Sequence, residues 1–540
     1  MNKPQSKDSF LPFIFCLLVD LGAIFWLNTT QAVAQITPDA TLPNNSVVLT
    51  NGNTIEITGG TTQGQNLFHS FQEFSLNTGN TAFFDNAIDI GNIVTRVTGG
   101  SVSNIDGLIR ANGTANLFFV NPSGIVFDNN AALDIGGSFI GSTATSLKFA
   151  DGSEFSAVTP EEPMLTVSIP VGLQYGGTNS GDITVKDSGN NLFIDFNTYT
   201  VDRSDRPVGL GVEPEQTLAL VGGNVFLEGG NLTAAQGNIE LGSVAGTGLV
   251  KLATDDLGWR LNYEQVSNFQ EIALSEAASL EASGSSGGRV RVKGGFVSLA
   301  DGSAILTDTL GDGTGGSLTI EAEETEIYGV ADNGFTSSLF TNVHLGATGK
   351  GGDLLIDSDY LYVGDGAQVN VNTFASGDAG TLTVNASDVE ILGGYVDEDF
   401  NSLNSGLFAQ ADIGQTGKGG DINVKADYLL VGGGGQINVN TFGDGDAGDL
   451  LVNAKEIELI AGARFLGSSG LYASADFDST GNGGNLVIDT ESLSITNGAQ
   501  AIAATFGAGA GGNLSVTARN IELSGTSPGG TASGDRKSVV

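Results

Sequence analysis

The stretch Gly351-Gly352-Asp353-Leu354-Leu355-Ile356 decides the fold, because it is one copy of a pattern that recurs through the second half of the chain. In each copy a pair of small residues, Gly-Gly or Ala-Gly, precedes a run of alternating apolar and polar residues. The second glycines lie at positions 288, 316, 352, 380, 420, 448, 484 and 512. Successive copies are thus 28, 36, 28, 40, 28, 36 and 28 residues apart, so the repeating unit is a pair of coils, one short and one long.

Within each copy the apolar residues recur with a period of two, which is the period of a β-strand. We expect Leu382 and Val384 to face the interior, with Thr383 facing outward, and the same arrangement for Leu450, Leu451 and Val452. Short strands that repeat in this way stack into parallel sheets. The sequence therefore predicts an all-β protein, a right-handed parallel β-helix, with the hand given by the rule for parallel crossovers.

A second pattern concerns the side chains that stacking brings together. Residues 368–374, Gln-Val-Asn-Val-Asn-Thr-Phe, recur at 436–442 and, more faintly, at 500–506. We expect these copies to lie on one another, with Phe on Phe and Asn on Asn.

The long units are expected to carry an insertion at one recurring point, which includes residues 338–341, 406–409 and 470–473, each behind a variable polar loop. The richest of these loops is 395–400. Insertions in solenoids gather on one face, which is often a binding face, although a solvated loop is the more ordinary interpretation here.

Composition excludes some partners. The 540 residues include 81 Gly, and 61 acidic residues stand against 21 basic ones, for a net charge of −40. A chain this acidic repels nucleic acid and anionic membrane surfaces, so we predict no nucleic-acid partner.

The N-terminus has the features of an export signal. Lys3 and Lys7 precede an apolar run at 10–27, and Ala32-Val33-Ala34 forms a cleavage site before Gln35. The alternative is an uncleaved membrane anchor, since the run is about long enough to span a bilayer. An acidic residue and a proline within the run, together with the cleavage site, favour a signal peptide at 1–34. Its removal would also remove Cys16, the only cysteine, so the exported chain would hold no disulfide.

The stretch Asn121-Pro122-Ser123-Gly124-Ile125 reads as a type I turn between the apolar strands 116–120 and 125–127. It resembles the Asn-Pro-x-Gly-Ile motif of two-partner secretion exoproteins, the family of filamentous haemagglutinin. Further similar stretches occur in the family's order. They are 66–74, which begins Asn66-Leu67-Phe68, followed by 93–97, 137–140, 218–223 and 229–234. Two departures are Ser123, where the family often has Asn, and the lack of a second Asn-Pro motif upstream.

The resemblance implies a domain organisation and a route. Residues 35–270 would form a capped, β-helical secretion module, and 271–540 a region of paired coils that is truncated at its C-terminus. An outer-membrane β-barrel transporter with periplasmic capture domains would recognise the module, with Asn66, Leu67, Phe68 and residues 121–125 as its secretion motifs. The protein would then be an adhesin, secreted or displayed on the surface of a Gram-negative-type bacterium, with cell-surface glycans or proteins as partners.

The main alternative is a β-helical polysaccharide lyase or hydrolase, because such enzymes share the fold. They need clustered carboxylates with a nearby cation. Basic residues are few and scattered here, and His69 and His344 have no partner that the sequence predicts. Asp444-Gly445-Asp446-Ala447-Gly448-Asp449 does not match a calcium loop. We therefore predict no catalytic residues, no cofactor and no metal site.

Overall fold

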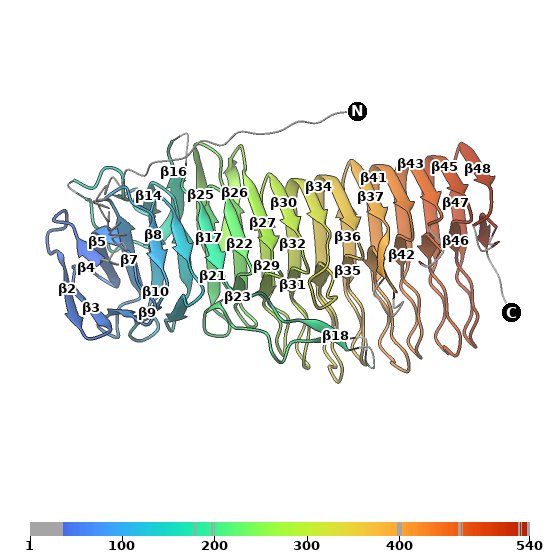
Figure 1. The fold of residues 1–540 in the computed structure, drawn as a ribbon, viewed down its shortest axis with the longest axis horizontal. Coiled ribbons are helices and arrows are strands. Elements are labelled where there is room, and N and C mark those ends of the chain that lie inside the picture. Colours follow the sequence, from blue (N-terminus) through green and yellow to red (C-terminus); the bar gives the residue numbers. More distant parts are fainter. Residues whose placement is uncertain are drawn as a thin grey trace, which may run out of the picture. The chain divides into compact units, whose positions relative to one another are not determined.

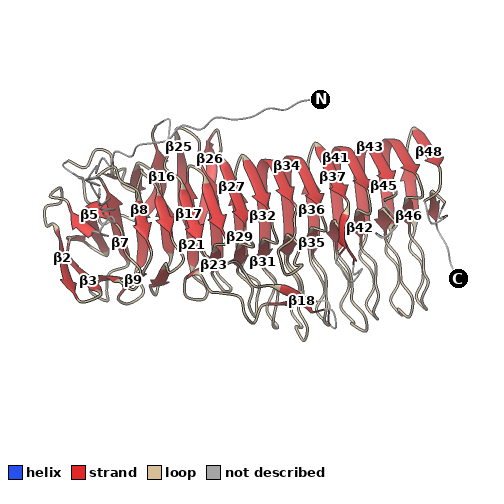
Figure 2. Cartoon of the chain, viewed as in Figure 1, coloured by secondary structure: helices blue, strands red, loops and turns tan. Residues whose placement is uncertain are grey.

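The computed structural model describes residues 36–536, apart from short gaps at 162, 178–179, 196–197, 199, 397–401, 463–465, 467, 528–529 and 531. The expected signal peptide, its cleavage site and most of the loop at 395–400 lie outside the described residues. Every regular element among the described residues is a β-strand (Figure 2). A search of these residues for a helix able to cross a membrane finds none.

The strands form a parallel β-helix whose coils follow one another in chain order from blue to red (Figure 1). Each regular coil has three faces. The first two faces belong to one sheet, because long strands such as β34 (Asp353–Gly364) bend across both and pair with β36 (Thr381–Asn385) on the first face and with β37 (Asp388–Leu392) on the second.

The strand bounds follow the faces. On the first face lie β5 Asn66–Phe74, β7 Asn92–Val97, β10 Asn116–Val120, β13 Phe139–Ser142, β21 Thr217–Gly222, β24 Asn238–Ser243, β29 Arg289–Lys293, β36 and β47 Leu514–Thr517. On the second lie β8 Ser103–Ile105, β11 Ile125–Phe127, β17 Ile183–Lys186, β22 Val225–Glu228, β27 Glu271–Ser275, β30 Phe296–Leu299, β37 and β48 Asn520–Ser524. The strands β32 Ser317–Ile327, β34, β41 Asp421–Gly432, β43 Leu450–Ile460 and β45 Leu486–Thr496 span both.

The third face consists of short strands in two sheets. The N-terminal sheet holds β2 Ser46–Asn51, β3 Thr54–Gly59, β6 Thr81–Phe84, β9 Leu108–Ala111 and β12 Ala132–Asp134. The following sheet holds β20 Leu210–Gly211, β23 Asn231–Thr233, β28 Ser279–Glu281, β31 Ala304–Leu306, β33 Ser338–Phe340, β35 Gln368–Asn370, β40 Gly406–Phe408, β42 Gln436–Asn438, β44 Gly470–Tyr472, β46 Gln500–Ile502 and β49 Gly534–Arg536.

The core lies inside the coils and confirms the predicted alternation. Leu382, Val384, Leu450 and Val452 are fully buried, whereas Leu451 is 42% exposed. One continuous apolar cluster runs from Ile36 to Ala503. Each coil therefore buries its inward side chains against those of its neighbours.

Sterics explain why the second residue of each repeated pair, which lies where the chain enters the first face, is always glycine. A Cβ at Gly316 would lie 1.7 Å from the carbonyl oxygen of Gly288, and one at Gly448 would lie 1.8 Å from that of Gly420. Neither gap can hold a carbon atom, so a side chain at either position would force neighbouring coils apart. Glycine recurs because the backbones of consecutive coils touch at this corner.

Two expectations about the repeats were wrong. The segments that begin at 338, 406 and 470 are not insertions but the third-face strands β33, β40 and β44 of the long coils. The extra residues are only the loops before them, one of which forms the hairpin of β38 (Gly394–Val396) and β39 (Ser402–Asn404). Asn370 therefore lies beside Phe408, not beside Asn438, because a long coil separates each pair of short coils.

Three additions interrupt the helix. The strands β1 (Ile36–Pro38) and β4 (Thr61–Gln63) pair antiparallel with β5 and cap the first coil. An antiparallel sheet packs outside the first face, with strands β14 Ser146–Phe149, β15 Glu154–Ser156, β16 Pro170–Tyr175, β25 Gly248–Asp255 and β26 Gly258–Val266. A hairpin of β18 (Phe193–Asp195) and β19 (Thr200–Asp202) reaches later coils of the third face.

Candidate functional site

The predicted turn at residues 121–124 joins the first face to the second. The Gly124 amide donates to the Asn121 carbonyl at 3.1 Å, which closes a β-turn. Ser123 does not have a positive φ, which excludes a type II turn and agrees with the type I prediction. The Asn121 side chain is fully buried: its Nδ2 donates to the Ser101 carbonyl and to Ser103 Oγ, both at 2.9 Å, and its Oδ1 accepts the Ser123 amide at 3.0 Å.

The turn is also fixed to the next coil. The Ile125 amide donates to the Asp182 carbonyl at 3.0 Å, and the Gly181 amide donates to the Pro122 carbonyl at 3.0 Å. Gly124 has a φ of +122°, and a Cβ there would lie 3.1 Å from the Asp182 oxygen. The motif is therefore an integral corner of the folded coil, and Asn121 is accessible only before the coil has formed.

The second predicted motif begins β5. Asn66 Nδ2 donates to the carbonyls of Thr166 (3.0 Å) and Ser168 (2.8 Å), and its Oδ1 accepts Asn92 Nδ2 at 2.9 Å. Leu67 faces the core inside the coils, whereas Phe68 faces outward beneath the antiparallel sheet, with its ring 5.1 Å from that of Phe155. All three residues are buried and structural in the folded protein.

The two motifs lie on the same face but do not meet. Asn66 pairs in register with Asn92, and Asn92 with Asn116, so Asn121 lies five residues further along the strand direction. At about 3.3 Å per residue this is about 16 Å. The two motifs therefore do not form one contact surface in the folded protein.

Sequence reasoning missed the arginine that ties this end of the protein together. Arg96, on β7, is fully buried, donates to Ser70 Oγ and Thr41 Oγ1, both at 2.8 Å, and donates to the Ser156 carbonyl at 2.5 Å. Its guanidinium lies 4.1 Å from the centre of the Phe155 ring. Arg96 thus joins the cap, the first face and the outer sheet. The only sequence signal was an arginine inside an apolar strand.

Two titratable side chains near the N-terminal cap, Asp39 and His69, have shifted pKa values. Burial works to raise the pKa of Asp39, but hydrogen bonds from Thr41, Ser70 and Thr98 hold it below its usual value. His69 is buried, its Nδ1 lies 2.9 Å from Ser46 Oγ, and burial lowers its pKa to about 3. His69 is therefore a neutral histidine of the protein core.

The outer sheet ends close to the boundary expected at residue 270, since β26 ends at Val266. The coils themselves continue across this point, because β24 pairs with β29 and β27 pairs with β30 in parallel register. The described residues thus form an N-terminally capped β-helix with an outer sheet over its first coils, followed by plain paired coils.

These features define a class of protein: a capped parallel β-helix whose first coils carry a distinct module. Residues 34–292 match the family model of the TPS secretion domain, where TPS stands for two-partner secretion. The chain therefore carries a two-partner secretion domain, as the filamentous-haemagglutinin-like motifs predicted. It is an exoprotein exported by two-partner secretion.

Two solved structures are similar. The HMW1 secretion domain from Haemophilus influenzae has 16% identity and a TM-score of 0.42, covering 90% of this chain and 100% of that one. The filamentous haemagglutinin secretion domain has 14% identity and a TM-score of 0.33, covering 78% of this chain and 99% of that one. Among curated protein sequences, none matches this chain.

Proposed function

We propose that this protein is an adhesin whose N-terminal coils are captured by an outer-membrane β-barrel transporter while the chain is still extended. The observation that carries the proposal is the complete burial of Asn121 within a module of the TPS secretion domain family. A transporter can contact this side chain only before the coil closes. Strand addition to a periplasmic capture domain would suit an extended, alternating segment of this kind.

The cap gives folding a direction. The strands β1 and β4 cover the first coil, and Arg96 fastens that cap to the outer sheet. New coils can therefore dock only on the C-terminal side of those already formed. At the cell surface this would draw the chain outward without a nucleotide, since each docked coil buries its apolar row. Cleavage of the signal peptide at 1–34 belongs to the same proposed route.

A polysaccharide-cleaving activity finds little support in the described residues. On the outer third face, Glu281 of β28 and Asp308, which follows β31, come together around Arg203, whose guanidinium lies 3.5 Å from Glu281 and donates to Asp308 at 2.6 Å. Both carboxylates are buried in this ion pair, so neither is free to act on a substrate. Asp412 lies three coils from Asp308, about 14 Å along the axis, which exceeds the roughly 5–9.5 Å that separates glycosidase carboxylates.

The test compares two buried asparagines of the same module in cells that express the transporter. Asn121 and Asn231 are both fully buried, and each side chain makes several hydrogen bonds. We expect Asn121→Ala and Asn231→Ala to lower stability alike, each by about 2–4 kcal/mol, since each leaves buried partners unpaired. Burial makes this cost larger than the roughly 1 kcal/mol that an exposed turn would give.

Secreted yield then separates the two roles. We expect Asn121→Ala to reduce secretion strongly and Asn231→Ala to reduce it only slightly. Equal loss of secretion in the two variants at equal thermal midpoints would show that the motif acts through stability alone.

A further inference from the structure

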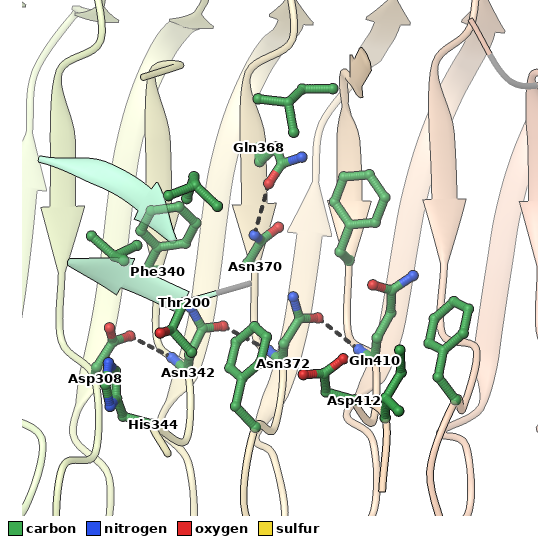
Figure 3. A pocket seen from close by; sticks show the side chains of 17 residues that line it. Thr200, Asp308, Phe340, Asn342, His344, Gln368, Asn370, Asn372, Gln410 and Asp412 are labelled. Atoms are coloured by element: carbon green, nitrogen blue, oxygen red, sulfur yellow. Dashed lines mark hydrogen bonds between the residues drawn. The ribbon is translucent and has the colours of Figure 1, made fainter. Parts of the chain in front are cut away.

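The outer surface of the third face carries a groove of about 330 Å³ in the repeat region (Figure 3). Five consecutive coils contribute to it, from Asp308, which follows β31 in the chain, to Phe442, which follows β42. The hairpin of β18 and β19 lines it with Ile194, Thr200 and Val201, and the hairpin of β38 and β39 with Leu403. Chain segments more than 200 residues apart therefore build one site.

The repeat places aromatic and amide side chains in this groove by strand alternation. Leu339, Val369 and Leu407 are paired in register and point into the core. The next residue of each strand points outward, which gives the row Phe340, Asn370 and Phe408 across the groove. Because short and long coils alternate, an aromatic ring recurs at every second coil and an amide lies between two rings.

A second outward row repeats the arrangement further along the chain. Thr373, Ala411 and Thr441 form successive bridges, so the residues that follow them, Phe374, Asp412 and Phe442, lie side by side. Rings of one row are two coils apart, about 10 Å. This is comparable to the length of a disaccharide unit, in which alternate sugar rings present the same face.

One amide in the groove lacks a partner. Asn370 is 94% buried, and its Nδ2 donates to Gln368 Oε1 at 3.1 Å, but its Oδ1 accepts no hydrogen bond. In the equivalent coil, Asn438 Oδ1 accepts the Asn440 amide at 2.9 Å. At the groove the corresponding amide, that of Asn372, instead donates to Asn342 Oδ1 at 2.8 Å, so the Asn370 oxygen is left without a partner, covered by its neighbours.

A buried, unpaired acceptor is unfavourable unless a ligand satisfies it. The same sequence, Gln-x-Asn-Val-Asn-Thr-Phe, thus forms a closed hydrogen-bond arrangement at 436–442 and an open one at 368–374. The open copy is the one that lines the groove.

The charges of the lining select the ligand class. The groove contains the carboxylates of Asp308 and Asp412 and the imidazole of His344, but neither Lys nor Arg lines it among the described residues. Burial raises the pKa of Asp412. Asn and Gln side chains each offer a donor and an acceptor, as a sugar hydroxyl does, and aromatic rings pack against the apolar faces of pyranoses.

We propose that this groove binds a neutral oligosaccharide, whose sugar rings pack on Phe442 and against the small exposed parts of Phe374 and Phe408, and whose hydroxyl reaches Asn370 Oδ1 by displacing the groups that cover it. An acidic glycan would meet the carboxylate of Asp412, and the cation beside the lining, Arg203, is already paired with Asp308. This inference deepens the proposed adhesive role by giving it a site and a ligand class. It is independent of how the protein is exported.

The experiment measures binding of purified, folded protein to cellohexaose, xylohexaose, mannohexaose and, as the acidic probe, hexagalacturonate, by calorimetry. We expect at least one neutral hexasaccharide to bind and hexagalacturonate not to bind. Phe442→Ala should weaken the binding by about 10-fold or more, because it removes a ring from the groove. The matched control is Phe506→Ala, at the equivalent position of the next short coil and outside the groove, which should leave binding unchanged.

Asn370→Ala and Asn438→Ala form a second matched pair. We expect only Asn370→Ala to weaken binding, whereas Asn438→Ala should affect stability alone because its amide bond is internal. The proposal is overturned by binding of none of the neutral probes, by equal or stronger binding of hexagalacturonate, or by equal effects of the Phe442 and Phe506 variants. None of these results would bear on secretion, which is measured in cells.

Discussion

The stability of the outer sheet should depend on pH through one buried carboxyl group. Glu240, on β24, is 1% exposed, and neither of its carboxylate oxygens has a hydrogen-bond partner. The nearby cation is engaged elsewhere: Arg291 donates to both oxygens of Glu321, at 3.1 and 2.8 Å, and to the Leu261 carbonyl at 2.7 Å. Burial raises the pKa of Glu240 to about 7, although the charge of Arg291 opposes this.

The sign follows from the two pKa values. In the unfolded chain the group has an ordinary pKa of 4.5, so between that value and about 7 the folded state holds a proton that the unfolded state has lost. The stabilisation is fully present below pH 4.5 and is lost as pH rises through about 7. The difference corresponds to about 3 kcal/mol.

The perturbation is Glu240→Gln, which cannot ionise. We expect the variant to match the native protein near pH 4.5 and to be more stable at pH 8, by up to about 3 kcal/mol. The assay is chemical unfolding at a series of pH values, followed by the fluorescence of Trp259 in the covering strand. Glu264→Gln, an exposed site on that strand, should leave the pH profile unchanged. A native pH profile that Glu240→Gln fails to flatten would refute the reasoning.

The remaining predictions concern the coils and the N-terminus. Gly448→Ala should lower the unfolding midpoint markedly, because its Cβ would lie 1.8 Å from the Gly420 carbonyl oxygen. Gly177→Ala should not lower it, because the space around Gly177 is open. Equal midpoints of the two variants would contradict the steric explanation. Val384→Asp should cost several kcal/mol in thermal unfolding because it buries an unpaired charge, while Thr383→Asp on the outer side should cost little. N-terminal sequencing of exported protein should begin at Gln35, and a start at Met1 would restore the membrane-anchor interpretation.

The sequence by itself determined the local and periodic features of this protein. Alternation in residues such as Leu382 and Val384 sufficed to predict which side chains fill the core, because a strand's side chains must alternate between its two faces. The spacing of the second glycines sufficed to predict paired coils. The turn at Asn121 followed from the conformations that Pro and Gly permit, and the order of the motifs sufficed to predict the secretion family.

Only the tertiary structure decided which coils are neighbours and what they build together. The repeats at 368–374 and 436–442 differ in sequence only at Val369 and Ile437. Asn370 and Asn438 both lie beside Phe408 of the intervening long coil, yet only the Asn370 oxygen stays unpaired. The two hairpins that line the groove come from distant segments. Arg96 likewise joins residues 41, 70 and 156. Such contacts depend on long-range packing and on the points at which the hairpins and the outer sheet leave and rejoin the β-helix. The local periodicity of the sequence specifies neither the packing nor these points.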